Sequence, residues 1–387
     1  MKATSSLTSI SNGRSSLQPF DFQPLGRVLF ESGGLAKLGE VVRDLAASHV
    51  LLVTDPGLEL SGHPQRAQAF LQEAGVNVIV FDGVVENPSE KEVAAGVEVA
   101  RRMGVNAIVA VGGGSTMDCA KGINFILTNG GRMADYKGHD KATKPMLPSV
   151  GVPTTSGTGS EAQSYALISD PVTHLKMACG DKKAAFRVSI LDPELTITQP
   201  RGVTAATGID ALAHAVESFV CTKANPFSRM ASSAAFRQLE PNLERVLSNP
   251  NDREARAAMQ IGSHFSGIAI EAAMLGVCHS CANPLTAQFG TVHGTAIGIM
   301  LPHVVRFNAT IVEREYRELT GHSSEWLANR IETLVRATGM PTKLRDAEVS
   351  RESLSELAEE ANQQWTARFN PRPVTAKEIL SLFDAAW

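Results

Sequence analysis

The chain has 387 residues, of which 43% are apolar, and its formal net charge is -4. This length exceeds what one ordinary hydrophobic core fills, so we expect two packed domains. Lysines and arginines are scattered singly, which excludes the basic stripe that neutralises nucleic-acid phosphates. We therefore expect no nucleic-acid partner.

The first 19 residues are rich in serine, and Lys2 and Arg14 are their only charged residues. This composition predicts a flexible tail, with an organelle transit sequence as the weaker alternative. The segment lacks the apolar core of a secretory signal, and no apolar run approaches the roughly 20 residues of a membrane helix. We therefore expect a cytoplasmic protein with no membrane contact.

From residue 20 to about residue 200, short apolar runs alternate with amphipathic segments, which predicts a parallel sheet wrapped by helices. One helix has readable ends, because Ser89 and Glu92 can form a capping box and Gly104 can terminate it. The expected strands are Val50–Val53, Val78–Phe81, Ala107–Val111, Val150–Val152 and Val188–Leu191.

After Pro200 the strand-like runs end, and long segments rich in Ala, Leu, Glu and Arg continue to the C-terminus. Pro200 and Gly202, which disfavour regular secondary structure, mark the boundary between the two kinds of segment. We predict an α/β domain over residues 20–200 and an all-α domain over residues 201–387.

A glycine-rich turn, Gly112–Lys121, directly follows the expected strand Ala107–Val111 and leads into a helix. Glycines let the backbone approach an anion, and a helix N-terminus offers free N–H donors, so pyrophosphate is the natural ligand. The segment lacks the G-x-G-x-x-G fingerprint, and a plain tight turn is the alternative.

A second loop, Pro153–Glu161, also follows an expected strand and is rich in hydroxyls and glycines. Such loops also serve as simple capping devices, but two of them at the carboxyl edge of one sheet favour a dinucleotide site. Asp55, after the strand Val50–Val53, can accept hydrogen bonds from an adenosine ribose and so favours NAD over NADP. The alternative is an ordinary turn aspartate before Pro56.

Asp210 and His214 lie four residues apart in a segment that we expect to begin a helix near Gly208, so both reach one face. This spacing also arises by chance. Downstream, His279 and His293 lie among small and apolar residues, which indicates burial and the need for a partner. One carboxylate and three imidazoles suit Fe2+, and Zn2+ is also possible.

Five cysteines show no repeated pattern, and in a chain of this length without a signal we expect reduced, buried thiols. Cys278 and Cys281 form one C-x-x-C pair, which is weak evidence for a redox or zinc site because no second pair completes it.

Together these motifs resemble the iron-containing, group III alcohol dehydrogenases, whose architecture is similar to that of dehydroquinate synthase. The resemblance runs from about Phe20 to the C-terminus. It rests on Gly112–Lys121, Pro153–Glu161, Lys176–Ala178, Asp192–Glu194, Gly208–Glu217 and Leu301–Val304.

The resemblance implies a metal-dependent enzyme that transfers a hydride between a small primary alcohol, or a hydroxy acid, and NAD. It places the metal on Asp210, His214, His279 and His293 in a cleft between the two domains. It assigns cofactor binding to Gly113, Gly114, Ser115, Asp118, Thr154, Thr155, Thr158 and Lys176, of which Lys176 rests on the resemblance alone. A homodimer or a larger homo-oligomer is also implied.

One position departs from the family pattern, because Asn283 stands where a second histidine is usual after the third ligand. Asparagine does not titrate near neutral pH, so a general acid or base role at this catalytic position is in doubt. Tyr165 is a further candidate for the substrate pocket, with a packed strand aromatic as the alternative.

Three other enzymatic functions compete with this interpretation, and a metal-binding protein without activity is a further alternative because of Asn283. A hydroxyacid–oxoacid transhydrogenase keeps its nicotinamide bound and shuttles hydride between two substrates. A lyase similar to dehydroquinate synthase uses NAD only transiently. A metal-dependent hydrolase would use the same ligand set but leaves both glycine-rich loops unexplained.

Overall fold

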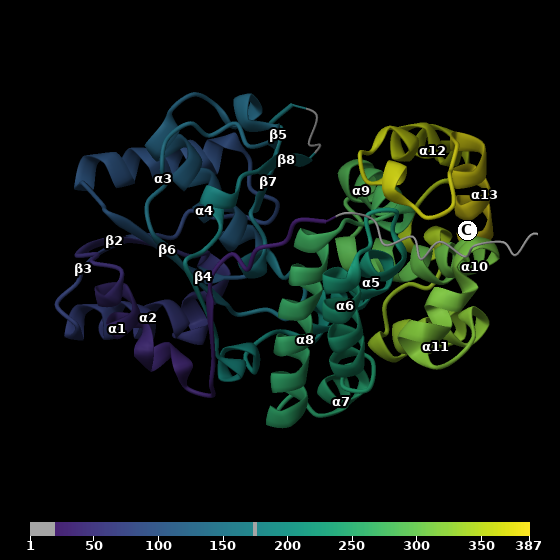
Figure 1. The fold of residues 1–387 in the computed structure, drawn as a ribbon, viewed down its shortest axis with the longest axis horizontal. Helices are drawn as coiled ribbons and strands as arrows, with labels where there is room; N and C mark the ends of the chain where they lie inside the picture. The colour runs from purple at the N-terminus through teal and green to yellow at the C-terminus, as the bar shows by residue number, and fades with distance from the viewer. Residues whose placement is uncertain (1–19, 173–175) are drawn as a thin grey trace, which may run out of the picture.

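The computed structural model describes residues 20–172 and 176–387, so the predicted tail 1–19 lies outside the described part. Figure 1 shows two lobes, one built around a sheet and one built of helices. The predicted fold class, an α/β part followed by a helical part, is confirmed. The domain limits near residue 200 stay a prediction.

The first lobe is built on a six-stranded sheet in which every neighbouring pair is parallel, in the order β1-β9-β6-β4-β2-β3. The five predicted strands are all present, each within one residue of its expected ends, and β1 was not predicted. The strands are β1 (Arg27–Phe30), β2 (His49–Val53), β3 (Asn77–Phe81), β4 (Ala107–Gly112), β6 (Ser149–Pro153) and β9 (Val188–Leu191).

Helices cover both faces of this sheet, as Figure 1 shows. Alternate residues of a strand point to opposite faces, so Leu51 and Val53 join one apolar cluster, whereas Val50 and Leu52 join the other. The capping box predicted at Ser89 is present. The helices are α1 (Leu38–Asp44), α2 (His63–Glu73), α3 (Glu90–Met103) and α4 (Gly114–Asn129).

A small second sheet, which the sequence did not reveal, extends this lobe toward the helical one. Its order is β5-β8-β7, with β5 (Gly138–His139), β7 (Tyr165–Ser169) and β8 (Lys176–Gly180). Ile168 and Cys179 pack into the core on the α3 and α4 side of the large sheet. The sheet thereby fixes Lys176, the first residue of β8, at the edge that faces the second lobe.

The second lobe contains only helices and short turns among the described residues after Leu191. Its first helix begins at Arg201 and not near Gly208 as expected. Gly208 is an interior position, because a Cβ there would lie 2.5 Å from Leu243 Cδ1, so glycine permits close helix packing. The helices are α5 (Arg201–Val220), α6 (Pro226–Leu239), α7 (Leu243–Ser248), α8 (Arg253–Ala272), α9 (Val277–Phe289), α10 (His293–Thr320), α11 (Ser324–Thr338), α12 (Leu354–Gln363) and α13 (Ala376–Ala386).

Helix α10 has 28 residues, and one window of it reaches a mean hydropathy of 1.3, so by length and composition it could cross a membrane. No such helix was predicted from the sequence. However, 67% of that window is buried inside the protein, where α10 packs against α5, α9 and α11. Burial of this kind is typical of the central helix of a helical core.

The five cysteines are free and buried, as predicted. Cys278 and Cys281 both lie inside α9, and Cys278 Sγ donates a long hydrogen bond, 3.7 Å, to the carbonyl oxygen of Ile297. Burial raises the pKa of both thiols, to values that keep them protonated at neutral pH. The pair therefore behaves as core residues.

Candidate active site

The two glycine-rich loops predicted from the sequence lie against each other at the carboxyl edge of the large sheet. The N–H of Thr154 donates to the carbonyl oxygen of Gly112 at 2.9 Å. A Cβ on Gly113 would lie 3.2 Å from Thr155 Cγ2, and one on Gly114 would lie 2.5 Å from Thr158 Cγ2. Glycine at position 114 in particular therefore allows this close contact between the loops.

The same contact leaves the N-terminus of α4 open to a ligand. Gly113 is the N-cap residue and has no side chain that could accept from the first N–H groups of the helix. Unpaired N–H groups and the positive end of a 16-residue helix suit a pyrophosphate. These residues therefore fit a dinucleotide.

Ser115 and Asp118 lie on the first turns of α4 and already have partners. Ser115 Oγ accepts from the N–H of Asn87 at 3.2 Å. Asp118 is only 9% exposed and accepts from Ser160 Oγ at 2.5 Å. Burial raises the pKa of Asp118. In this structure Asp118 joins α4 to the second loop, and contact with a cofactor stays a prediction.

Asp55 is half-buried directly after β2, at the start of a short 3-10 helix. Its Oδ2 accepts from Thr116 Oγ1 at 3.1 Å, so its carboxylate lies beside the beginning of α4. This position is next to the glycine-rich turn. Selection of NAD by Asp55 stays a prediction.

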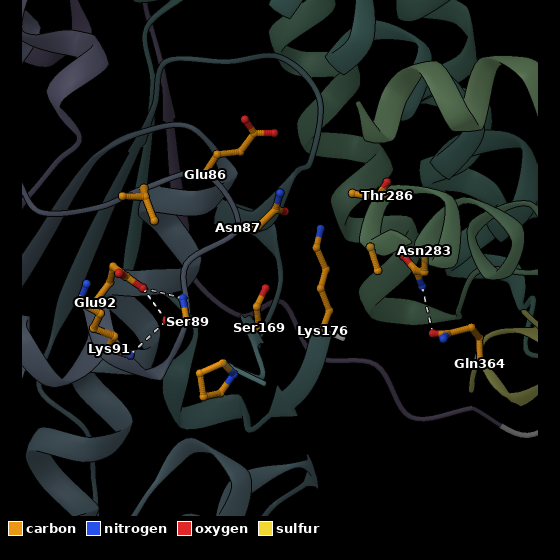
Figure 2. Close-up of a pocket in the computed structure, with 13 residues that line it drawn as sticks. Glu86, Asn87, Ser89, Lys91, Glu92, Ser169, Lys176, Asn283, Thr286 and Gln364 are labelled. Carbon is orange, nitrogen blue, oxygen red and sulfur yellow. Dashed lines mark hydrogen bonds between the residues drawn. The ribbon is translucent and has the colours of Figure 1, made fainter. Parts of the chain in front are cut away.

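A cavity of about 490 Å³ separates the cofactor side from the helical lobe. Figure 2 shows Lys176 extending from β8 on one side and Asn283 on α9 facing it from the other. Asn283 Nδ2 donates to Gln364 Oε1 at 3.3 Å. The described lining residues are Val85, Glu86, Asn87, Ser89, Lys91, Glu92, Ser169, Pro171, Lys176, Asn283, Thr286, Ala287 and Gln364.

Tyr165 is absent from the described residues that line this cavity. Its ring packs 6.1 Å from that of Trp365, and its hydroxyl lies 2.9 Å from Nε2 of His139. Its pKa is raised by burial. These contacts favour the alternative considered above, a packed strand aromatic.

The four predicted metal ligands converge on one point. Asp210 and His214 come from α5, His279 comes from α9, and His293 is the first residue of α10. Nε2 of His214 and Nε2 of His279 each lie 3.3 Å from Asp210 Oδ1, and Nε2 of His293 lies 3.7 Å from it. Residues up to 83 positions apart in the numbering, from 210 to 293, therefore present ligand atoms to one small volume.

Burial keeps two of the three imidazoles of this cluster uncharged. It lowers the pKa of His214 to about 4 and that of His293 to about 3, so both imidazoles are neutral at pH 7. Burial alone would raise the pKa of Asp210, but the surrounding imidazoles hold it well below its usual range. Neutral imidazoles beside an ionised carboxylate are the forms that bind a metal.

Glu217, which was not predicted from the sequence, holds His279. Nδ1 of His279 donates to Glu217 Oε2, and Glu217 Oε1 accepts from the N–H of Cys278 at 2.8 Å. Burial lowers the pKa of His279, but the charge of Glu217 and the bonds to Glu217 and Asp210 outweigh it and raise the pKa to about 9. A bond at Nδ1 leaves Nε2 directed at Asp210, as in metal sites whose histidines are oriented by a carboxylate.

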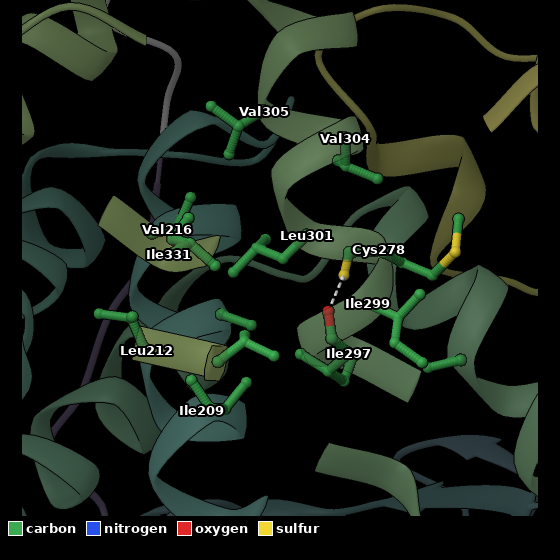
Figure 3. Packing of buried hydrophobic residues seen from close by; sticks show 14 of the residues in the cluster. Ile209, Leu212, Val216, Cys278, Ile297, Ile299, Leu301, Val304, Val305 and Ile331 are labelled. Atoms are coloured by element: carbon green, nitrogen blue, oxygen red, sulfur yellow. Dashed lines mark hydrogen bonds between the residues drawn. The ribbon is translucent and has the colours of Figure 1, made fainter. Parts of the chain in front are cut away.

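A sequence signal for Glu217 did exist. Asp210, His214 and Glu217 follow each other at i, i+4 and i+7 along α5, which places them on one face of the helix. The opposite face packs into the core, where Leu212 and Val216 lie among side chains of α10 and α11 (Figure 3). This packing fixes the direction in which the three polar side chains point.

The donor set fits a divalent ion. Within the described residues no lysine or arginine pairs with Asp210, so three imidazole nitrogens are the neighbours of its Oδ1. Ligand atoms of Asp210, His279 and His293 all lie within 4.8 Å of one another. Three nitrogens and one oxygen suit Fe2+ or Zn2+, with a position left for a substrate oxygen.

Comparison with known proteins agrees with this arrangement. Residues 26–193 match the family model described as iron-containing alcohol dehydrogenase, and residues 204–387 match the C-terminal model of the Fe-containing alcohol dehydrogenase family. The chain belongs to the iron-containing alcohol dehydrogenase family. It is therefore an oxidoreductase and an alcohol dehydrogenase, and the hydrolase interpretation is set aside.

Two curated relatives and one solved structure illustrate the similarity. The chain is 35% identical over 366 residues to alcohol dehydrogenase 4 of Schizosaccharomyces pombe, covering 92% of this chain and 87% of that protein. It is 32% identical over 366 residues to an NAD-dependent methanol dehydrogenase of Bacillus methanolicus, covering 92% and 96%. The crystal structure of a 1,3-propanediol oxidoreductase matches with a TM-score of 0.91 and 35% identity, covering 96% and 100%.

Proposed function

We propose that this iron-containing alcohol dehydrogenase transfers a hydride reversibly between a small primary alcohol, or a hydroxy acid, and NAD. The observation that carries the proposal is the convergence of Asp210, His214, His279 and His293 on one point. One helical turn after His279, Asn283 lines the cavity that Lys176 also lines. The bound metal ion and the nicotinamide of NAD would then lie close enough to act on the same substrate.

In this proposal the four converging residues hold one divalent ion, Fe2+ or alternatively Zn2+. When bound, the ion supplies a Lewis acid that favours the alkoxide form of the alcohol. The family name supports iron. Zinc usually binds such ligands more tightly than ferrous iron, so metal availability decides which ion is present.

The N-terminal lobe binds NAD in this proposal, as the name of the Bacillus methanolicus relative supports. Gly113, Gly114 and Ser115 would present backbone N–H groups to the pyrophosphate. Asp55 would accept from the adenosine ribose. The remaining proposed cofactor residues are Asp118, Thr154, Thr155, Thr158 and Lys176.

Asn283 lies one turn after His279 on α9 and lines the cavity. Its amide can orient a substrate, but it cannot take up the alcohol proton near neutral pH. We propose that this proton leaves through water or ribose hydroxyls, and that Asn283 positions the substrate.

A direct assay tests the proposed function. Metal-reconstituted protein given one primary alcohol and excess NAD should form free NADH over many turnovers, and a chelator should stop the reaction. Turnover that persists after the metal has been removed would overturn the metal-dependent proposal. Oxidation of the alcohol that continues only while a second, oxidising substrate is present, with no free NADH formed, would point to the transhydrogenase.

The glycine-rich turn gives a second testable prediction. Replacing Gly114 with alanine puts a methyl group 2.5 Å from Thr158, so the loops must separate and the free N–H groups must shift. Overpacking of this kind costs about 1 to 3 kcal/mol, and an equal loss of binding free energy raises the Kd for NAD about 5- to 150-fold. Calorimetric titration with NAD measures the change.

Gly202→Ala is the matched control, because a Cβ there meets nothing within 4 Å. Its Kd for NAD should equal that of the unmodified protein. An unchanged Kd in Gly114→Ala would place the pyrophosphate elsewhere.

We also propose a cytoplasmic homodimer. The reduced, buried cysteines support the location. The first strand of the sheet supports the dimer, because β1 is an edge strand on which Val28 and Phe30 are 44% and 45% exposed. An unpaired edge with apolar side chains is a surface that a second copy of the chain can cover.

Phe30→Lys should therefore convert the dimer to a monomer, because a charge on each copy would face its equivalent across the interface. Size-exclusion chromatography with light scattering reports the mass. Val80→Lys, on the opposite edge strand β3, should leave the mass unchanged. A dimer that survives Phe30→Lys and dissociates with Val80→Lys would assign the interface to the other edge.

A further inference from the structure

Helix α8 lies on the side of the helical lobe that faces the sheet lobe (Figure 1), and it contacts the short 3-10 turn Ser160–Ala162. Four of its residues stand at positions i, i+4, i+7 and i+11, which places them on one face of the helix. Each of them contacts the second glycine-rich loop, Pro153–Glu161, or Ser164 just after it. These four residues, which we name the support face, are Gln260, His264, Gly267 and Glu271.

Two carboxylates in this contact come from opposite lobes. Glu161 belongs to the loop, and its Oε1 accepts from Nδ1 of His264 at 3.0 Å, with both side chains only 4% exposed. Glu271 belongs to α8, and it accepts from the N–H of Ser164 at 3.0 Å and from the Ser164 hydroxyl at 2.7 Å. A buried polar group that loses its partner costs more than the bond itself contributes, so the contact resists separation.

The centre of the contact is formed by two glycine backbones. Gly159 has a φ of 59°, in the left-handed region that favours glycine, and it packs directly on Gly267. A Cβ on Gly267 would lie 2.4 Å from the carbonyl oxygen of Gly159. Because backbone meets backbone here, no flexible side chain can move aside. The separation between the loop and α8 is therefore fixed at this point.

The position of the loop matters to the cofactor side, because the same loop packs on the N-terminus of α4. Thr158 lies against Gly114, where we place the pyrophosphate. From α4, the buried Lys121 donates to the carbonyl oxygen of Ser160 at 2.7 Å and to the Ser160 hydroxyl at 3.0 Å. The loop is thus held between α4 of one lobe and α8 of the other.

We propose that the support face of α8 positions the second loop for NAD, so that the helical lobe contributes to cofactor binding as well as to metal binding. Its four residues are positioning residues, because they act on the cofactor through the loop. This inference rests on the proposed function, which places NAD at this loop. A shift of α8 relative to the loop should therefore lower NAD affinity, while metal affinity and kcat at saturating NAD change little.

Gly267→Ala tests this with a single methyl group. The added Cβ pushes the backbone of Gly159 away from α8, and binding of NAD must then restore the loop against this overpacking. The Kd for NAD should rise about 5- to 150-fold, the range that corresponds to usual overpacking costs. Calorimetric titration of the metal-loaded enzyme with NAD measures this change. Titration of the metal-free protein with Fe2+ or Zn2+ should give an unchanged metal Kd.

Gly262→Ala is the matched control on the same helix. A Cβ there would lie 2.8 Å from Leu239 Cγ, so it overpacks α8 against α6 and away from the loop. Thermal unfolding should show a loss of stability in both variants, whereas only Gly267→Ala should lose NAD affinity. An equal rise of the Kd for NAD in both variants would show a general effect of a destabilised α8 and would overturn the support face.

Ser164→Ala provides a second variant that adds no bulk. It removes the hydroxyl that donates to Glu271, and it should raise the Kd for NAD about 2- to 12-fold, as expected for one hydrogen bond. If Gly267→Ala does not fold, the result for Ser164→Ala decides the matter. A Kd that neither variant changes would overturn the support face. An unmodified enzyme that does not bind NAD would instead count against the proposed function.

Discussion

Replacing His279 with alanine is expected to abolish alcohol oxidation and metal binding together. His279 supplies one of three imidazole nitrogens around Asp210, and its Nε2 lies 3.3 Å from Asp210 Oδ1. The bound ion would contribute several kcal/mol to the stabilisation of developing charge, so kcat/KM should fall by about a thousandfold or more. Metal analysis of the purified variant and steady-state rates of NADH formation measure the two losses.

His322→Ala is the matched control for this prediction. It removes an exposed imidazole from the same helical lobe, outside the metal cluster. Its metal content and kcat/KM should stay close to those of the unmodified enzyme. If His279→Ala retained full activity, or lost activity while keeping one bound ion in the same coordination, His279 would not be a ligand.

Replacing Glu217 with glutamine is expected to weaken metal binding about 10 to 100-fold, the range that is usual when the partner of a ligating histidine is changed. Glutamine keeps the size of the side chain but removes the charge that faces Nδ1 of His279. The imidazole is then less basic and less firmly oriented. Titration of metal-free protein with Fe2+ or Zn2+ gives the change in Kd.

The variant also separates a positioning role from a catalytic one. At saturating metal, Glu217→Gln should recover most of its kcat, because within the described residues the side-chain hydrogen bonds of Glu217 go to His279 and Cys278. Glu244→Gln, which removes a surface ion pair with Arg330, should leave the metal Kd unchanged. A kcat that stays low at saturating metal would show that Glu217 does more than hold His279.

Much of the fold could be predicted because the signals are local. The strands of the large sheet are short β-branched runs bounded by turn residues, and the helix after Ser89 carries its own capping box. The predicted start of α5 was wrong because a glycine such as Gly208 often marks a helix boundary. In the structure Gly208 lies inside the helix, where its lack of a side chain allows packing against Leu243. The small sheet was missed because β5 has two residues and β8 reads KMACG, which carries no alternation.

The residues of the candidate site also differ in whether a local sequence pattern reveals them. The spacing of Asp210 and His214 is a local pattern on one helix, so both could be named from the sequence. Glu217 lies on the same face but is charged, and a glutamate on a helix is usually an exposed residue. Gln364 pairs with Asn283 across 81 positions of sequence, and no periodic pattern signals such a contact.

One divalent ion held by four side chains beside bound NAD is the central feature proposed for this enzyme. Anomalous diffraction from crystals of the metal-loaded enzyme with NAD tests this directly. One peak is expected about 2.0 to 2.2 Å from Nε2 of His214, His279 and His293 and from a carboxylate oxygen of Asp210. A peak on other residues, or a metal-loaded enzyme in which these imidazoles point apart, would contradict the account.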